Sequence, residues 1–327
     1  MKGVNLGGWL VLEKWITPSL FHGMTAEDEY GWCIEKGDLK EQYLKKHRDT
    51  FITESDIAWI AEHGLQAIRL PIPYWLFGVE GPYVACDSYV IWLLDMAKKY
   101  KLQVLLDLHT ALGSQNGNDH SGRSGAINWT TEQNITATLN LLSNIVERFG
   151  GHPATLGIEL LNEPHSSIAH GVLLDYYVRA IDAIRRVHPH LSVVVSDAYR
   201  PLDWIGTSLG DIDNVYLDVH LYRVFSSEDK QLPVEQHLSR LQQEWSSMLG
   251  KLQRHIPVIV GEWSLGLDPN TLKHLNEEEQ SSATAAFAEA QLRVFERASG
   301  WFFWTYKTED YAGWSMRSAV SQGVLHI

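Results

Sequence analysis

Two glutamates, each near the end of an apolar stretch, are the residues best suited to chemistry in this 327-residue sequence. Glu163 closes the run LGIELLNEP at residues 156–164, and Glu262 lies in PVIVGEW at residues 257–263. Apolar runs of this kind predict buried strands, and desolvation at a strand end can raise a carboxyl pKa. A retaining glycosidase needs one such carboxyl group as proton donor and another as nucleophile. Either glutamate alone could cap a helix or pair with an arginine, but a matched pair beside aromatic residues favours catalysis.

Strand and helix signals alternate along the whole chain and would place both glutamates in one framework. Strands are expected at residues 3–10, 65–71, 102–109, 156–163, 191–197, 214–222, 257–263 and 300–306. Helices are expected at residues 54–63, 87–100, 130–149, 171–187, 233–254 and 277–297, with residues 17–50 irregular. This alternation predicts an α/β fold, a single (β/α)8 TIM barrel forming one domain over residues 1–327. A doubly wound open sheet is the competing architecture, but no Gly-rich fingerprint opens the first helix.

Polar and aromatic residues recur at the expected strand ends. They are Arg69, His109, Asn162, Glu163, His220, Tyr222, Glu262 and Trp304. Active residues of a TIM barrel come from the carboxyl ends of its strands, so this coincidence predicts one site. Arg69 stands inside an apolar run and is expected to need a buried carboxylate partner. The polar loop at residues 110–128 is too long to be idle in a compact fold and is expected to form a wall of the site.

Composition excludes several classes of partner. A formal net charge of −13 argues against nucleic acid, and no apolar run reaches membrane-spanning length. Two cysteines, Cys33 and Cys86, cannot form a disulfide framework. The first expected strand leaves no room for a signal peptide, so the protein would be intracellular or would have lost an export segment. We expect a monomer.

Several motifs resemble glycoside hydrolase family 5, and within it the fungal exo-β-1,3-glucanases. They are GVNLGGWLVLE at residues 3–13, ALGSQNG at 111–117, GIELLNEP at 157–164, GEWS at 261–264, WFFWT at 301–305 and KTE at 307–309. The resemblance covers nearly the whole chain. It implies a TIM barrel, retention of anomeric configuration, no metal or other cofactor, and a β-glucan substrate.

The resemblance also assigns roles to individual residues. Glu163 would be the acid/base and Glu262 the nucleophile, oriented by Arg69, while Asn162 would bind the sugar 2-hydroxyl. Further sugar-binding positions implied by the family are Glu13, His109, Trp129, His220, Tyr222, Phe225 and Trp304. Among these, Trp304 would stack under the glucose, and Trp129 with Phe225 would hold the next sugar. Retention predicts carboxyl groups roughly 5–5.5 Å apart, with Glu163 protonated and Glu262 ionised in the free enzyme.

The exact substrate and the mode of cleavage are left open by these residues. The stretch after Ser264 is shorter than in the fungal enzymes and the chain starts at the first strand, so an open groove is expected. Internal cleavage of β-1,3-glucan or mixed β-1,3/1,4-glucan follows from that expectation. The alternatives are a strict exo-β-1,3-glucosidase, an endo-β-1,4-glucanase of the cellulase type, and an enzyme acting on mannan.

Two other classes of protein are less well supported. A metal hydrolase could use Asp107, His109 and His220, but no His-x-His or His-Glu-x-x-His spacing is present. A non-catalytic glucan-binding protein would not require both Glu163 and Glu262.

Overall fold

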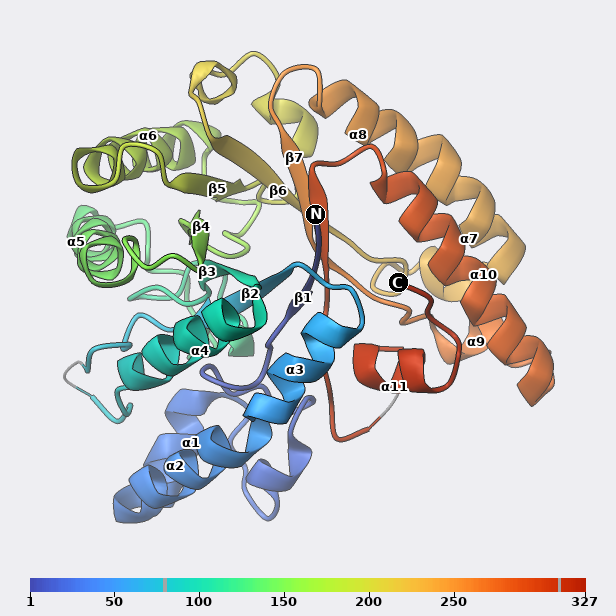
Figure 1. Ribbon diagram of the computed structural model, residues 1–327, viewed down its shortest axis with the longest axis horizontal. Coiled ribbons are helices and arrows are strands. Elements are labelled where there is room, and N and C mark those ends of the chain that lie inside the picture. Colours follow the sequence, from blue (N-terminus) through green and yellow to red (C-terminus); the bar gives the residue numbers. More distant parts are fainter. Residues whose placement is uncertain (79–80, 311–312) are drawn as a thin grey trace.

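The computed structural model describes residues 1–78, 81–310 and 313–327 (Figure 1). Within these residues, eight parallel strands in sequence order close into a barrel surrounded by helices. The strands are β1 (Lys2–Asn5), β2 (Ala67–Ile72), β3 (Gln103–Leu108), β4 (Thr155–Glu159), β5 (Ser192–Ser196), β6 (Val215–Leu221), β7 (Val258–Trp263) and β8 (Gly300–Phe303). The barrel closes where β8 pairs with β1, with Lys2 beside Trp301 and Val4 beside Phe303. The predicted (β/α)8 architecture is therefore confirmed.

In the sequence, the α-helices lie between successive strands, except that one follows the last strand, β8. They are α1 (Glu29–Lys36), α2 (Lys40–Phe51), α3 (Glu54–Glu62), α4 (Asp87–Tyr100), α5 (Glu132–Phe149), α6 (His170–Val187), α7 (Val234–Arg240), α8 (Ser246–Leu252), α9 (Pro269–Leu272), α10 (Glu277–Phe295) and α11 (Met316–Ser321). A π-helical turn at Leu241–Trp245 joins α7 to α8, so the helix expected at 233–254 is interrupted. The start of α3 shows how local chemistry sets a boundary, because Thr53 and Asp56 form a reciprocal capping box.

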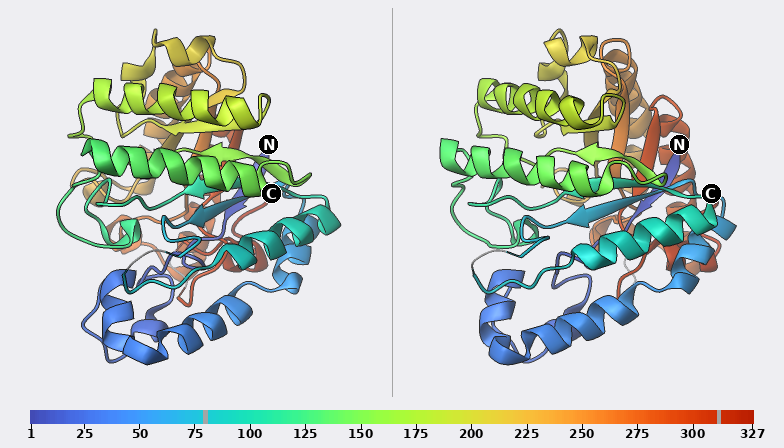
Figure 2. Two further views of the ribbon diagram at one scale, coloured as in Figure 1. Left: turned by 90° about the vertical axis from the view of Figure 1, so that its left-hand side faces the viewer. Right: turned by 60° about the vertical axis from the view of Figure 1, so that its left-hand side comes forward.

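The segment after β1 differs from the expectation of irregular structure at residues 17–50. Helices α1 and α2 lie there, outside the ring of crossover helices (Figures 1 and 2). They pack on a small apolar cluster of their own that includes Phe21, Trp32 and Leu44. The prediction was wrong because the apolar signal is short: the buried apolar residues are only Trp32 and Cys33 in α1 and Leu44 in α2.

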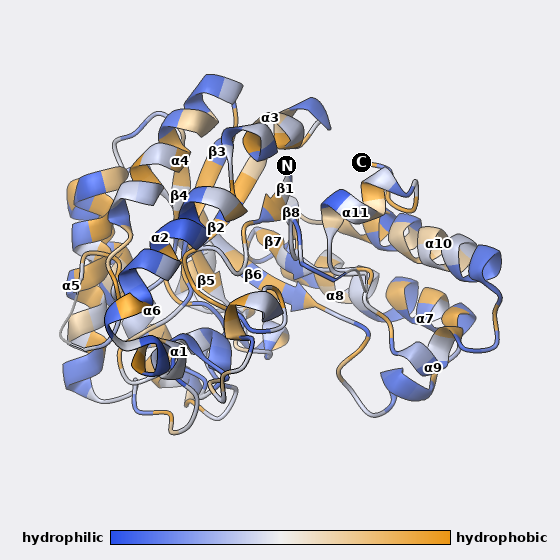
Figure 3. Cartoon of the chain, turned by 90° about the horizontal axis from the view of Figure 1, so that it is seen from below, coloured by the Kyte–Doolittle hydropathy of each residue, from blue (hydrophilic) through white to orange (hydrophobic). Residues whose placement is uncertain are grey.

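The main core lies between the barrel and its helices. Figure 3 shows hydrophobic residues concentrated on the strands and hydrophilic residues along the outer faces of the helices. Inside the barrel, side chains two residues apart on one strand point the same way and form layers. The amino-terminal layer is apolar and contains Ala67, Leu105, Val194, Ile259 and Phe302. The next layer toward the carboxyl ends is charged and contains Arg69, Asp107, Glu159 and Asp218, all fully buried.

Two further expectations from composition can be compared with the structure. Cys33 and Cys86 are buried free thiols, so neither takes part in a disulfide. None of the helices that the structure describes has the length and apolarity needed to cross a membrane.

Candidate active site

The two candidate catalytic glutamates come together at the carboxyl end of the barrel. Glu262 belongs to β7, where it pairs with His220 of β6. Glu163 lies beyond the end of β4 at Glu159, so that strand is shorter than expected. Its backbone is left-handed, with φ of 44°, an uncommon conformation outside glycine, and its carbonyl oxygen accepts a hydrogen bond from Nδ2 of Asn116 at 3.0 Å. One carboxyl oxygen of Glu163 and one of Glu262 lie within 4.8 Å of each other.

Arg69 is the centre of a buried ionic network beneath these carboxyl groups. Its Nε donates to Glu159 at 2.7 Å, and Nη1 donates to Glu262 at 3.1 Å. The other terminal nitrogen lies 3.2 Å from Asp107 and donates to Asn162 at 2.9 Å. The expected carboxylate partner of Arg69 is thus confirmed, although the structure supplies several. Because the guanidinium group holds one oxygen of Glu262, it fixes the orientation of that carboxylate.

A glycine in β7 makes room for this network. The backbone N–H of Gly261 donates to Asp218 at 2.5 Å, and a Cβ atom at residue 261 would lie 1.8 Å from the same carboxylate. Only glycine allows this approach. Asn5 of β1 completes the layer by donating to the carbonyl of Gly261 and accepting from Arg69.

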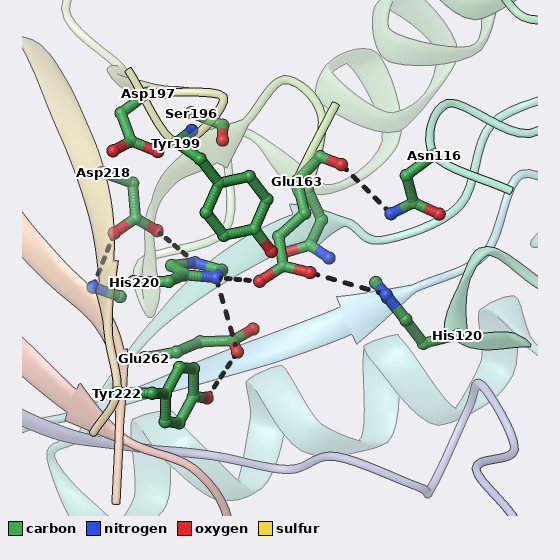
Figure 4. Close-up of polar contacts among 12 residues, drawn as sticks. Asn116, His120, Glu163, Ser196, Asp197, Tyr199, Asp218, His220, Tyr222 and Glu262 are labelled. Atoms are coloured by element: carbon green, nitrogen blue, oxygen red, sulfur yellow. Dashed lines mark hydrogen bonds and ion pairs between the residues drawn. The ribbon is translucent and has the colours of Figure 1, made fainter. Parts of the chain in front are cut away.

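His220 and Tyr222 connect the two glutamates (Figure 4). Nδ1 of His220 lies 2.6 Å from Oε1 of Glu163 and 3.4 Å from Oε2 of Glu262. The hydroxyl group of Tyr222 donates to Oε2 of Glu262 at 2.7 Å. Nε2 of His220 lies 3.4 Å from Asp218 on the opposite side of the ring. The imidazole therefore faces three carboxyl groups.

The charges around these three side chains shift the pKa values of Glu163, His220 and Glu262. Burial alone would raise the pKa of Glu163, but the hydrogen bond from His220 and its charge hold that pKa below the usual range. Burial opposes charge on His220 too, yet Glu262 and Asp218 raise its pKa well above the ordinary value. The pKa of Glu262 is raised by burial, against the charges of His220 and Arg69. These directions contradict the expectation of a protonated Glu163 in the free enzyme, because the hydrogen bond and the charge of His220 favour its carboxylate form.

A cavity of about 520 Å³ opens above the two glutamates. It is lined by Glu13, Trp15, His109, Asn118, Asp119, His120, Glu163, Tyr199, Tyr222, Phe225, Glu262, Trp304 and Trp314. Seven of these were expected from the sequence: Glu13, His109, Glu163, Tyr222, Phe225, Glu262 and Trp304. The ring of Trp304 stacks on that of His109, with centroids 5.5 Å apart. The loop at residues 110–128 supplies Asn118, Asp119 and His120, as the expectation of a loop wall requires.

Two buried polar atoms remain without a protein partner around this cavity. Nδ2 of Asn162 makes no hydrogen bond within the described part of the chain, although Oδ1 is held by Arg69. The same holds for Oε1 of Glu13, whose other oxygen accepts from the indole of Trp15 at 2.9 Å. Buried polar groups are normally hydrogen-bonded, so both atoms are suited to a bound hydroxyl group.

Trp129 does not belong to the site, contrary to the expectation that it holds a sugar beside Phe225. Its side chain is fully buried, its indole N–H donates to Thr138 of α5 at 3.1 Å, and its ring packs on Tyr176 of α6. Since Trp129 does not line the cavity, its role is structural. Phe225 is 66% exposed and does line the cavity.

Several lining residues were missed by the sequence reasoning. Trp15 and Trp314 pack edge to face at 5.3 Å, and Trp314 continues the aromatic wall to Tyr222 at 5.4 Å. No local pattern separates these aromatic residues from core ones. The buried Glu159 and Asp218 were also missed, although both lie at inward positions of strands, as Arg69 and Asp107 do.

Among the residues that the structure describes, two clusters have a geometry that could hold a cation: Glu159 with Asp218 and His220, and Glu163 with His220 and Glu262. In both, the ring of His220 already lies between the carboxylates. Arg69 adds a further positive charge beside Glu159 and Glu262.

Comparison with known proteins identifies the family and several relatives of this chain. A family model described as Cellulase (glycosyl hydrolase family 5) matches residues 36–310. The chain is 36% identical over 370 residues to probable glucan 1,3-beta-glucosidase A of Emericella nidulans, covering 99% of this chain and 89% of that protein. It is 34% identical over 364 residues to glucan 1,3-beta-glucosidase 1 of Schizosaccharomyces pombe, with coverage of 99% and 87%. The crystal structure of AoRut has the same fold, with a TM-score of 0.83 at 23% identity over 99% of this chain and 96% of that one.

Proposed function

The chain belongs to glycosyl hydrolase family 5 and is a glycoside hydrolase, and we propose that it hydrolyses β-1,3-glucan by double displacement. Glu163 is the acid/base and Glu262 the nucleophile of this proposal, on a single catalytic domain. The observation that supports the proposal most directly is the distance of at most 4.8 Å between carboxyl oxygens. Retaining enzymes hold their carboxyl groups about 5–5.5 Å apart, whereas inverting enzymes separate them by about 6.5–9.5 Å to admit a water molecule.

The first step needs a proton on Glu163, and His220 is its source in this proposal. Nδ1 of His220 lies 2.6 Å from Oε1 of Glu163, close enough to pass a proton to it. The protonated Glu163 gives its proton to the glycosidic oxygen while Glu262 attacks the anomeric carbon, forming a glycosyl ester. Glu163, now a carboxylate, then removes a proton from water, which attacks the same carbon and releases the β-anomer.

The neighbouring side chains prepare Glu262 for this attack. Arg69 and Tyr222 each donate to one of its oxygens, which favours the ionised form that a nucleophile requires. The unpartnered Nδ2 of Asn162 is positioned to donate to the 2-hydroxyl group, an interaction that strengthens as the oxocarbenium ion develops. The ring of Trp304 offers a face for the glucose.

We further propose that cleavage releases glucose from a chain end. The segment after β1 carries Glu13 and Trp15 into the cavity, and it is tied to the segment after β8. Glu309 accepts from the backbone N–H of Ser19 at 2.8 Å, and its own N–H donates to Ile16 at 3.0 Å. These contacts favour a pocket that ends beyond the glucose. Both reported relatives are also named glucan 1,3-beta-glucosidases.

The internal cleavage expected from the sequence is the second candidate. The region aligned with the Emericella nidulans protein spans 370 residues, more than the 327 of this chain, so that relative contains segments absent here. Shorter loops favour a more open site. β-1,3-Glucan and mixed β-1,3/1,4-glucan are the substrates proposed for this candidate.

Products from laminarin, lichenan and carboxymethylcellulose test both proposals. We expect glucose as the first product from laminarin, appearing as the β-anomer in proton NMR spectra recorded before mutarotation. Glu163→Gln and Glu262→Gln should each lower kcat/KM by about 10²-fold or more, whereas the exposed Glu147→Gln should not. Initial release of the α-anomer would contradict retention. A rapid fall in lichenan viscosity would favour internal cleavage, and a preference for carboxymethylcellulose would replace β-1,3-glucan as the substrate.

A further inference from the structure

A second histidine faces the proposed acid/base from the side opposite His220 (Figure 4). Nε2 of His120 lies 3.5 Å from Oε2 of Glu163, while His220 occupies Oε1. The two side chains of this contact are 16% and 12% exposed. Each oxygen of Glu163 therefore has its own imidazole neighbour.

The loop that carries His120 is held in place by its own hydrogen bonds. The hydroxyl group of Ser121 donates to the carbonyl of Asn118 at 2.7 Å and lies 2.7 Å from the hydroxyl group of Ser114. Tyr83 also donates to the carbonyl of Gly122 at 3.1 Å. His120 thus reaches the cavity from an anchored segment.

Charged and titratable groups face His120 from four elements. They are Asp119 on its own loop, His109 after β3, Glu163 after β4 and His220 on β6. The ring of His109 lies 5.6 Å away. Burial lowers the pKa of His120 below its usual value, against the attraction of Glu163 and Asp119. The amide nitrogen of Asn118 lies 3.2 Å from Nε2, an arrangement in which the amide donates and an unprotonated Nε2 accepts.

We propose that His120 is a positioning residue that determines whether Glu163 can act as an acid. Neutral His120 places no positive charge beside Oε2, so Glu163 can take the proton from His220 and give it to the leaving group. Protonated His120 places a cation beside Oε2 and holds Glu163 as a carboxylate, so protonation of the leaving group fails in acid solution. This inference rests on the proposed role of Glu163.

Substrates whose leaving groups differ in their need for a proton should respond differently to the protonation of His120. A 2,4-dinitrophenolate leaves without protonation, so its glucoside should report only the ionisation of the nucleophile at acid pH. Laminaritriose needs the proton from Glu163 and should also report His120. The kcat/KM of wild-type protein for laminaritriose should therefore fall at a higher pH than that for 2,4-dinitrophenyl β-glucoside, by a separation on the order of one pH unit.

The test compares this separation in three proteins. His120→Gln keeps a polar group of similar reach but cannot titrate, so the two acid limbs should coincide. His165→Gln, a change at an exposed histidine after Glu163, should keep the wild-type separation. His120→Asn repeats the test if the glutamine variant does not fold. A separation that persists in His120→Gln, or is absent from the wild type, overturns the proposal.

A second measurement does not depend on turnover. The ring nitrogens of His120, assigned by their loss in His120→Gln, should titrate below pH 6.5 in NMR spectra, and Glu163→Gln should lower that pKa further. An unchanged pKa in Glu163→Gln would overturn the proposed contact. If Glu163→Gln also hydrolysed laminaritriose at the wild-type rate, the proposed function would fail as well; if it did not, only the role of His120 would be lost.

Discussion

The two ends of the barrel interior are filled by opposite kinds of side chain, although the same strands supply both. At the amino end, Ala67, Leu105 and Phe302 belong to a buried apolar cluster. Two residues further along β2 and β3 the inward positions are Arg69 and Asp107, equally buried but charged. An apolar layer stabilises the fold because its side chains are removed from water. A charged layer is stable only while every charged group keeps its partner.

This difference indicates that the charged end of the barrel supports the chemistry of the site. Several carboxylates around one guanidinium group cost desolvation energy that a hydrophobic layer of equal volume would not. The network nevertheless fixes Glu262 and Asn162 directly beneath the cavity. Variants at the two ends should therefore separate activity from stability.

The largest effect is expected from Arg69→Met. Removing the guanidinium group leaves Glu159, Asp107 and Glu262 without their main counter-charge, at a cost of about 3–5 kcal/mol in the free energy of unfolding. Activity should be lost even in the fraction that remains folded, because Glu262 is no longer oriented. Urea unfolding and kcat/KM per folded molecule measure the two losses. Arg293→Met, which breaks an exposed ion pair with Glu289, is the matched control and should change stability by under about 0.5 kcal/mol.

Phe302→Ala should produce the opposite pattern at the other end. Deleting a fully buried ring leaves a cavity and should cost about 3–5 kcal/mol of stability. Since the ring of Phe302 belongs to the apolar cluster at the amino end, kcat/KM per folded molecule should stay at the wild-type value. Urea unfolding and activity at low temperature check this result. A large drop in kcat/KM of the folded enzyme would show that the two ends are not separable.

A pH-dependent effect should be confined to the charged end. Burial raises the pKa of Asp197, just after β5, to about 7, although the N–H of Tyr199 and the charge of His220 oppose the shift. The folded state therefore holds a proton that the unfolded state, with an ordinary pKa near 3.8, releases. Stability from this group is present at low pH and is lost as pH rises from about 4 to about 7.

Asp197→Asn removes that linkage while keeping a similar shape. The free energy of unfolding of the variant minus that of the wild type should increase by on the order of 2 kcal/mol when the pH is raised from 4.5 to 8. Urea unfolding at both pH values measures this change. Phe302→Ala should show the same difference from wild type at both pH values. An equal difference for Asp197→Asn at both pH values would mean that its folded-state pKa is not raised.

The smallest effect is expected from Phe225→Ala. This exposed ring forms part of the cavity wall, so its loss should raise KM for laminaritriose about two- to tenfold and leave the unfolding midpoint unchanged. Trp129→Ala is the informative partner, because the sequence had assigned it the same role. As a buried core residue it should cost about 3–5 kcal/mol of stability without altering KM. A raised KM with unchanged stability in Trp129→Ala would show that Trp129 contacts the substrate.

Much of this protein could be determined from the sequence alone. The alternation of apolar strands with amphipathic helices predicted the barrel, because each period records which face must be buried. The boundaries of α4 and the start of α3 were those expected. Glu163 and Glu262 could be identified because strand ends of a parallel barrel converge at one face.

Tertiary structure alone decided how these residues are connected. Nothing local distinguishes Trp129 in the core from Trp15 and Trp314 in the cavity wall, since an aromatic side chain suits both environments. The raised pKa of His220 and the lowered pKa of Glu163 depend on charged groups from other strands, so the sequence alone predicted a protonated Glu163 instead. The approach of His120 to Glu163 depends on the path of a polar loop, and such a path leaves no periodic signal. Periodicity reports burial, whereas contacts between distant segments exist only after the chain has folded.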